Sequence, residues 1–220
     1  MVIRNRLVAF IFRIVMFVLL SGVLSIYLSS TYTWAALLEF EVETTIIYLI
    51  GLGIAIIINL IDLRHGISGI AMGFYMPFML NLTAFTFIGN IMYFAYSLPN
   101  GFASSNQASL FFHAFALVIP TLEWLLFDIK GTVKWYSAFM AMLYPVFYVI
   151  FMGFRALIFA DAPLPSGQMY PYPFLKPGWD MFILWSIVSF FVVYGICLAY
   201  IFLNNLLAGK YRHKQEINPF

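Results

Sequence analysis

The feature that most constrains this chain is a series of long apolar blocks separated by short polar breaks. A helix needs about 20 mostly apolar residues to cross the hydrocarbon core of a bilayer. The blocks of that kind are Leu7–Ser29, Thr44–Ile61, Ile67–Tyr96, Ser109–Phe127, Trp135–Phe154 and Met181–Leu207. The pattern predicts an all-α fold, a polytopic membrane protein in which residues 1–220 form a single bundle of six transmembrane helices.

Composition excludes a water-soluble fold. Hydrophobic residues make up 64% of the chain and charged residues 9%, against roughly 45–50% and about 25% in a soluble domain. A soluble domain of this size could not bury so much apolar surface. The sequence also has no soluble domain between the blocks, and no internal repeat typical of inverted-repeat transporters.

Lysine and arginine positions predict the orientation of the bundle. If the N-terminus is cytoplasmic, one side of the membrane receives Arg4, Arg6, Arg64, Lys130, Lys134, Lys210, Arg212 and Lys214. The other side receives only Arg155 and Lys176. The positive-inside rule therefore predicts that both termini are cytoplasmic. Arg13 lies inside the first block and is expected to extend back to the inner face. The net charge of +2 gives no reason to expect a nucleic-acid partner.

His113 and Glu123 are ionisable residues within predicted spans, which makes each a candidate functional group. His113 lies about one turn from the outer end of its span, where an imidazole could act as a general base. The alternative is a histidine that bonds a neighbouring helix for packing. Glu123 lies about 15 Å further along that helix, too far to share a reaction centre. It is interpreted with Asp128 as a polar pair at the inner edge, bonded to Lys130 or Lys134.

Glu41, Thr44 and Thr45 follow an i, i+3, i+4 pattern at the start of the second span. If the helix includes Glu41, the three side chains share one face. A threonine hydroxyl beside a histidine is a possible nucleophile and base pair, and a carboxylate can orient the imidazole. The alternative is an N-terminal helix cap.

Other polar residues have simpler interpretations. Arg155 could bind a carboxylate or phosphate through its planar guanidinium, or act as an interfacial anchor. Asn59, Asn81 and Asn90 are predicted to form hydrogen bonds between helices. A metal site is not expected, because one histidine near the outer face with no neighbouring cysteine gives too few ligands. No cofactor is expected either.

Several strings carry a resemblance to a known family. They are His113, Pro120, Glu123-Trp124-Leu125-Leu126-Phe127, Tyr144-Pro145, Tyr148, Arg155 and Tyr170-Pro171-Tyr172-Pro173-Phe174. In this order they resemble the androgen-induced-gene-like family of six-helix membrane proteins, including its bacterial relatives. The resemblance covers roughly Phe40 to Phe182, and the paired Tyr-Pro string is its most specific part.

The resemblance implies a hydrolase of fatty acid esters of hydroxy fatty acids, with a threonine near the start of helix 2 and a histidine in a later helix. The histidine role falls on His113. Counted from Asp62, the threonine is Thr44, whereas alignment on the string Phe40-Glu41-Val42-Glu43-Thr44-Thr45 puts Glu41 at that position. Two departures are Glu123 and Lys176, where relatives tend to have aspartate.

The sequence thus predicts an intramembrane hydrolase of lipid esters with its site near the outer leaflet of a bacterial plasma membrane. His113, Thr44 and Glu41 are the candidate catalytic residues. The candidate substrate-binding residues are Arg155, Thr45, Tyr170 and Tyr172, the last two in a stiff aromatic segment that also includes Phe174 and covers the site. The substrate would be a membrane lipid or fatty ester, and no protein partner is specified. The alternative is a non-enzymatic lipid-binding, transport or scaffold protein.

Overall fold

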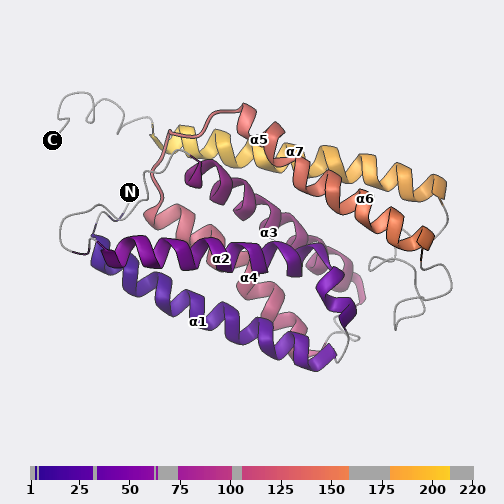
Figure 1. The fold of residues 1–220 in the computed structure, drawn as a ribbon, viewed down its shortest axis with the longest axis horizontal. Helices are drawn as coiled ribbons and strands as arrows, with labels where there is room; N and C mark the ends of the chain where they lie inside the picture. The colour runs from indigo at the N-terminus through magenta and orange to yellow at the C-terminus, as the bar shows by residue number, and fades with distance from the viewer. Residues whose placement is uncertain are drawn as a thin grey trace.

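The fold is known from a computed structural model that describes residues 3, 5–31, 34–61, 63, 74–100, 106–158 and 179–208. In chain order, the elements are α1 (Arg6–Thr31), η1 (Trp34–Leu38), α2 (Phe40–Ile61), α3 (Tyr75–Ser97), η2 (Leu98–Asn100), α4 (Gln107–Phe127), α5 (Tyr136–Ala141), α6 (Leu143–Ile158) and α7 (Trp179–Ala208). Figure 1 shows the long helices packed side by side.

The described residues contain six helical segments long and apolar enough to cross a bilayer, with α5 and α6 together forming the fifth. This finding confirms the predicted all-α, six-helix bundle, and the chain is an integral membrane protein. The predicted boundaries shift slightly. For example, α2 begins at Phe40 rather than Thr44, and the start of the block Ile67–Tyr96 lies outside the described residues.

The fifth span is predicted as one helix from Trp135 to Phe154, but it is divided at Met142. Pro145 explains the division. Proline has no N–H to donate to the carbonyl four residues earlier, here Ala141, and its ring collides with that carbonyl. At the division, the Met142 amide donates to two carbonyl oxygens, those of Ala138 and Phe139, at 3.2 and 3.1 Å. The chain then starts a second helix at Leu143.

The third helix, α3, is the centre of the bundle and packs against α2, α4, α5 and α7. It is also the most buried of the spans, whereas α7 and α1 are the least buried. In Figure 1, α1 lies at one edge, while α6 and α7 lie together at the opposite edge. The large apolar side chains exposed on α1 and α7 therefore face lipid.

Two helices approach closely where α3 carries Gly89. A Cβ at this position would lie 3.1 Å from the Cβ of Glu41 and 3.4 Å from its Cα. Small residues permit such close contact between membrane helices. The contact brings the first turn of α2 against the part of α3 that carries Asn90.

Candidate functional site

Side chains from four parts of the chain meet at the end of the bundle where α4 begins. We call this group the histidine cluster: Tyr27 of α1, Glu39 before α2, Asn90 and Tyr93 of α3, and His113 of α4. His113 is 1% exposed. A histidine so placed, away from water and beside polar groups of other helices, is held in one orientation by its partners.

The hydrogen bond between His113 and Asn90 sets the tautomer of the imidazole. His113 Nδ1 lies 2.9 Å from Asn90 Oδ1, and the amide of Asn90 is oriented by its Nδ2, which donates to the carbonyl of Thr86 at 2.7 Å. Because the atom facing the ring is an amide oxygen, Nδ1 must carry the proton. The lone pair of a neutral His113 is therefore on Nε2, which forms no hydrogen bond to a described residue.

Two tyrosine rings hold the imidazole in place. Tyr93 stacks on it with ring centroids 3.6 Å apart, and Tyr27 meets it edge-on at 5.7 Å. The Tyr93 hydroxyl accepts a hydrogen bond from Ser109 at 3.0 Å. Rotation of the His113 ring would break these contacts as well as its bond to Asn90.

Glu39 adds an acid to the cluster. The hydroxyl of Tyr27 donates to Glu39 Oε2 at 2.7 Å. Burial, followed by the nearby carboxylate of Glu41, raises the pKa of Glu39 to about 8, although the hydrogen bond from Tyr27 opposes the shift. At neutral pH this carboxyl therefore keeps a proton in most molecules.

Glu41, Thr44 and Thr45 do share one buried face of α2. The hydroxyl groups of the two threonines, however, bond carbonyls of their own helix. Thr44 Oγ1 donates to the carbonyls of Phe40 at 2.8 Å and Glu41 at 3.2 Å, and Thr45 Oγ1 donates to Glu41 at 2.6 Å. The two threonine hydroxyls therefore do not cap the helix, because they bond carbonyls inside it rather than free amides at its start, whereas Glu41 and Glu43 do lie in the first turn.

The direct hydrogen bond expected between His113 and Thr44 or Glu41 is not formed among the described residues. The ring of His113 bonds Asn90 instead. Nevertheless, Glu41 is close to this pair, because its backbone packs on Gly89, the residue before Asn90.

Arg155 lies in the last turn of α6 and is 7% exposed. Its guanidinium carbon lies 5.5 Å from the ring centre of Trp34 in η1. The nearby apolar group contains Met152, Ala156 and Phe182, with Leu38 packed against it. No described contact joins Arg155 to His113. The other predicted substrate-binding residues, Tyr170 and Tyr172, lie outside the described residues, as does Phe174.

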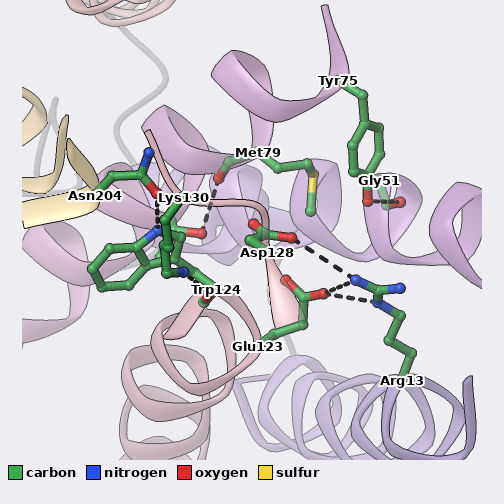
Figure 2. Close-up of polar contacts among 10 residues, drawn as sticks. Arg13, Gly51, Tyr75, Met79, Glu123, Trp124, Asp128, Lys130 and Asn204 are labelled. Carbon is green, nitrogen blue, oxygen red and sulfur yellow. Dashed lines mark hydrogen bonds and ion pairs between the residues drawn. The ribbon is translucent and has the colours of Figure 1, made fainter. Parts of the chain in front are cut away.

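A second group of charged residues lies at the opposite end of α1 and α4 (Figure 2). We call it the arginine cluster: Arg13 of α1, Glu123 of α4, and Asp128 and Lys130, which follow α4. Arg13 is fully buried and donates from Nε to Glu123 Oε1 at 2.7 Å, with Nη2 2.6 Å from that oxygen.

Two predictions about this end are wrong. Arg13 does not extend to the membrane surface, because Glu123 holds it inside the bundle. Lys130 does not bond Glu123, since its ammonium donates to the carbonyl of Trp124 and lies over the ring of that residue. The ammonium of Lys134 lies over the ring of Tyr136.

The asparagine predictions have mixed outcomes. Asn90 bonds His113 of another helix, and Asn81 Nδ2 donates to Ser137 Oγ of α5 at 3.3 Å, so both are confirmed. The prediction for Asn59 is wrong, because neither polar atom of its buried side chain has a hydrogen-bond partner in the described part of the chain. Tyr27, Tyr93 and Glu39 were not predicted as site residues, and no local motif marks them.

Within the described ranges, no group of three or more histidine, cysteine, aspartate or glutamate side chains could hold a metal ion. Comparisons with protein-family models, with curated proteins and with solved structures each gave no match. The resemblance to the androgen-induced-gene-like family therefore stays a prediction from the sequence.

Proposed function

We propose that this protein is an intramembrane hydrolase of lipid esters, with His113 as the general base and Asn90 as the residue that positions it. The observation that carries the proposal is the 2.9 Å hydrogen bond from His113 Nδ1 to Asn90 Oδ1. A base that is itself oriented by a third group is the recurring arrangement of nucleophilic hydrolases. The bond leaves Nε2 as the atom that accepts the proton.

In the proposed reaction, a water molecule attacks the ester carbonyl while Nε2 of His113 removes one of its protons. The imidazolium then gives that proton to the leaving alkoxide as the carbon–oxygen bond breaks, and the products are a fatty acid and an alcohol. One water is consumed in each cycle. The histidine has returned the proton that it took, so it is neutral again.

Water is favoured over Thr44 as the nucleophile because the hydroxyl of Thr44 already donates to carbonyls of its own helix. To attack an ester, Thr44 would have to break those bonds and turn toward His113. Arg155, Thr45, Tyr170 and Tyr172 remain proposed substrate-binding residues, with Arg155 suited to a carboxylate or phosphate.

The test is hydrolysis of a long-chain fatty ester by purified protein in lipid nanodiscs. His113→Ala should lower kcat by at least roughly 100-fold, because it removes the general base. Asn90→Ala should lower kcat roughly fivefold, since a neutral hydrogen bond contributes about 1 kcal/mol. The matched control is Asn81→Ala, which removes a buried asparagine of the same helix that bonds Ser137 instead.

Thr44→Ala then separates the two nucleophiles. Retained activity in this variant supports attack by water, and complete loss together with a trapped acyl group on Thr44 supports a covalent threonine. An unchanged kcat in a well-folded His113→Ala protein would reject the hydrolase and leave the non-enzymatic alternative.

That alternative, a lipid-binding, transport or scaffold protein, has one observation in its favour. His113 packs between Tyr93 and Tyr27 and bonds Asn90, which is also how a histidine joins three helices for stability. In that case His113→Ala would lower the melting temperature without changing any hydrolysis above the background of empty nanodiscs.

We also propose that both termini face the cytoplasm of a bacterial cell, as the lysine and arginine distribution favours. Cysteine labelling in cells tests the orientation, on a Cys197→Ala background. A membrane-impermeant reagent should label Ser104→Cys and leave Lys214→Cys unlabelled until the cells are opened. The reverse pattern would invert the orientation.

A further inference from the structure

The arginine cluster contains more buried charge than its one short ion pair needs. Two of the three guanidinium nitrogens of Arg13, Nε and Nη2, contact the same oxygen, Glu123 Oε1, at 2.7 and 2.6 Å. Asp128 Oδ1 is 3.8 Å from Arg13 Nη2, beyond hydrogen-bond distance, and Asp128 is 2% exposed. A second carboxylate thus lies in the interior at ion-pair distance from the guanidinium but beyond hydrogen-bond distance; Figure 2 marks this longer contact with a dashed line.

A buried hydroxyl group beside the cluster has no partner among the described residues. The Tyr48 hydroxyl of α2 is fully buried and forms no hydrogen bond to a residue that the structure describes, and it lies within electrostatic range of Arg13, Glu123 and Asp128. A buried polar group without a partner is costly. A phenol beside an acid that gains and loses a proton could bond that acid in either state, as donor to the carboxylate or acceptor from the carboxyl.

Four helices and one loop contribute groups that interact electrostatically within the cluster. They are Arg13 from α1, Tyr48 from α2, Tyr75 from α3 and Glu123 from α4, with Lys130 from the same loop. If all four charged residues are ionised, their formal charges cancel. A proton on Asp128 removes one of the two buried carboxylate charges, which a medium of low dielectric constant favours.

We propose that the arginine cluster is a proton-binding site in which Asp128 takes up and releases the proton, while Arg13 and Glu123 remain an ion pair. Uptake converts the Asp128 carboxylate to a carboxylic acid, with the proton taken from water at that end of the bundle, while Lys130 stays a cation. The ligand is therefore a proton, and the site is separate from the histidine cluster and independent of the proposed hydrolysis.

The electrostatic environment agrees with the assignment. Burial, followed by the charge of Glu123, raises the pKa of Asp128 well above its usual value, while Arg13 and Lys130 oppose the shift. Burial lowers the pKa of Lys130, and Asp128 and Glu123 oppose that change. The cation of Lys130 is therefore expected to lower the pH at which Asp128 takes up its proton.

Infrared difference spectroscopy on the full-length protein in lipid bilayers tests the site, with aspartate labelled with ¹³C at its carboxyl carbon. We expect a label-sensitive carboxylic acid band at neutral pH that disappears at alkaline pH. Asp128→Asn should remove the band. The matched control is Asp180→Asn, which changes an exposed aspartate in the first turn of α7 and should leave the band unchanged.

A label-sensitive band that persists in Asp128→Asn, or its absence from the unmodified protein at neutral pH, would overturn the proposal. If Asp128→Asn does not fold, Lys130→Met provides the decision. Removing a nearby cation should shift the midpoint of the band to higher pH by about 1 unit, since such a charge favours the ionised acid. A midpoint unchanged in Lys130→Met would also reject the site.

Discussion

The histidine cluster and the arginine cluster both join α1 to α4, yet they use different interactions. At one end, Tyr27 of α1 meets His113 of α4 through ring contact, and the histidine bonds a neutral amide. At the other end, Arg13 of α1 binds Glu123 of α4 as an ion pair. The two ends are roughly 20 Å apart along α1.

The difference teaches how each end depends on its partners. A neutral hydrogen bond that is lost leaves one polar atom unpaired, whereas a broken ion pair leaves a whole charge in the interior. The arginine cluster should therefore be the more sensitive to loss of one member. The histidine cluster, whose hydrogen bond joins two neutral side chains, should lose less stability when one member is removed.

The largest effect is expected from Arg13→Met, which leaves Glu123 buried without its cation. Breaking a buried ion pair by removing one partner costs about 3–5 kcal/mol, so the free energy of unfolding should fall by that amount. Chemical denaturation in mild detergent, followed by tryptophan fluorescence, measures the change.

The double variant Arg13→Met with Glu123→Leu is the control for that experiment. Replacing both charges with apolar side chains of similar volume is often neutral or stabilising, so stability should return to near that of the unmodified protein. If the double variant were as unstable as the sum of the two single variants, the ion pair would not be the cause.

A smaller loss is expected from Asn90→Ala, in comparison with Asn81→Ala. Each asparagine donates Nδ2 to the carbonyl four residues earlier in α3, at 2.7 Å. Only Asn90 uses its oxygen, since Asn81 Oδ1 has no partner among the described residues. Asn90→Ala strands the Nδ1–H of His113 and should cost about 1–3 kcal/mol. Equal losses in the two thermal unfolding curves would contradict the role given to Asn90.

Gly89→Ala probes the packing behind the histidine cluster. Its new Cβ would lie 3.1 Å from Glu41 Cβ, and Glu41 is fixed by the helix that carries it. Overpacking typically costs about 1–3 kcal/mol, and we expect the lower end because a shift of a few tenths of an ångström relieves the contact. Gly195→Ala is the control, because a Cβ there meets nothing within 4 Å. Equal melting temperatures of the two variants would contradict this prediction and show that α2 can shift away from Gly89 without loss of stability.

The smallest effect concerns the second buried arginine. Arg155 lies over the ring of Trp34, and a cation–π contact contributes about 0.5–1 kcal/mol at a partly exposed site. Trp34→Phe keeps an aromatic face and should lose less stability than Trp34→Leu. Trp135→Leu, at an exposed position, serves as the comparison. An unchanged unfolding midpoint in Trp34→Leu would show that contacts other than the Trp34 ring stabilise Arg155.

Local pattern was enough to predict the spans and the shared face of α2. Each transmembrane helix depends on its own hydropathy, and the i, i+3, i+4 spacing of Glu41, Thr44 and Thr45 follows from helix geometry alone. The division at Met142 was also accessible, because Pro145 marks it, but a continuous apolar block concealed it.

Partner choice between helices was not accessible from pattern. Arg13 and Glu123 are 110 positions apart. The sequence around Arg13 therefore does not show whether its side chain reaches the surface or binds Glu123. Similarly, the chemistry of Asn90 predicted a hydrogen bond to another helix. It did not predict that His113 would be the partner. These contacts depend on which helices become adjacent, and that is decided by the whole bundle.

The length of α7 has a consequence for the membrane around the protein. At 30 residues, this helix is about 45 Å long, whereas the hydrocarbon layer is about 30 Å thick. Since α7 is the least buried span, fewer contacts oppose a change in its tilt than in the tilt of the other helices. In thin bilayers it must lean further or project beyond the lipid, and in thick ones it can stand more upright. The inclination of this helix therefore depends on the thickness of the surrounding lipid as well as on its packing against α3.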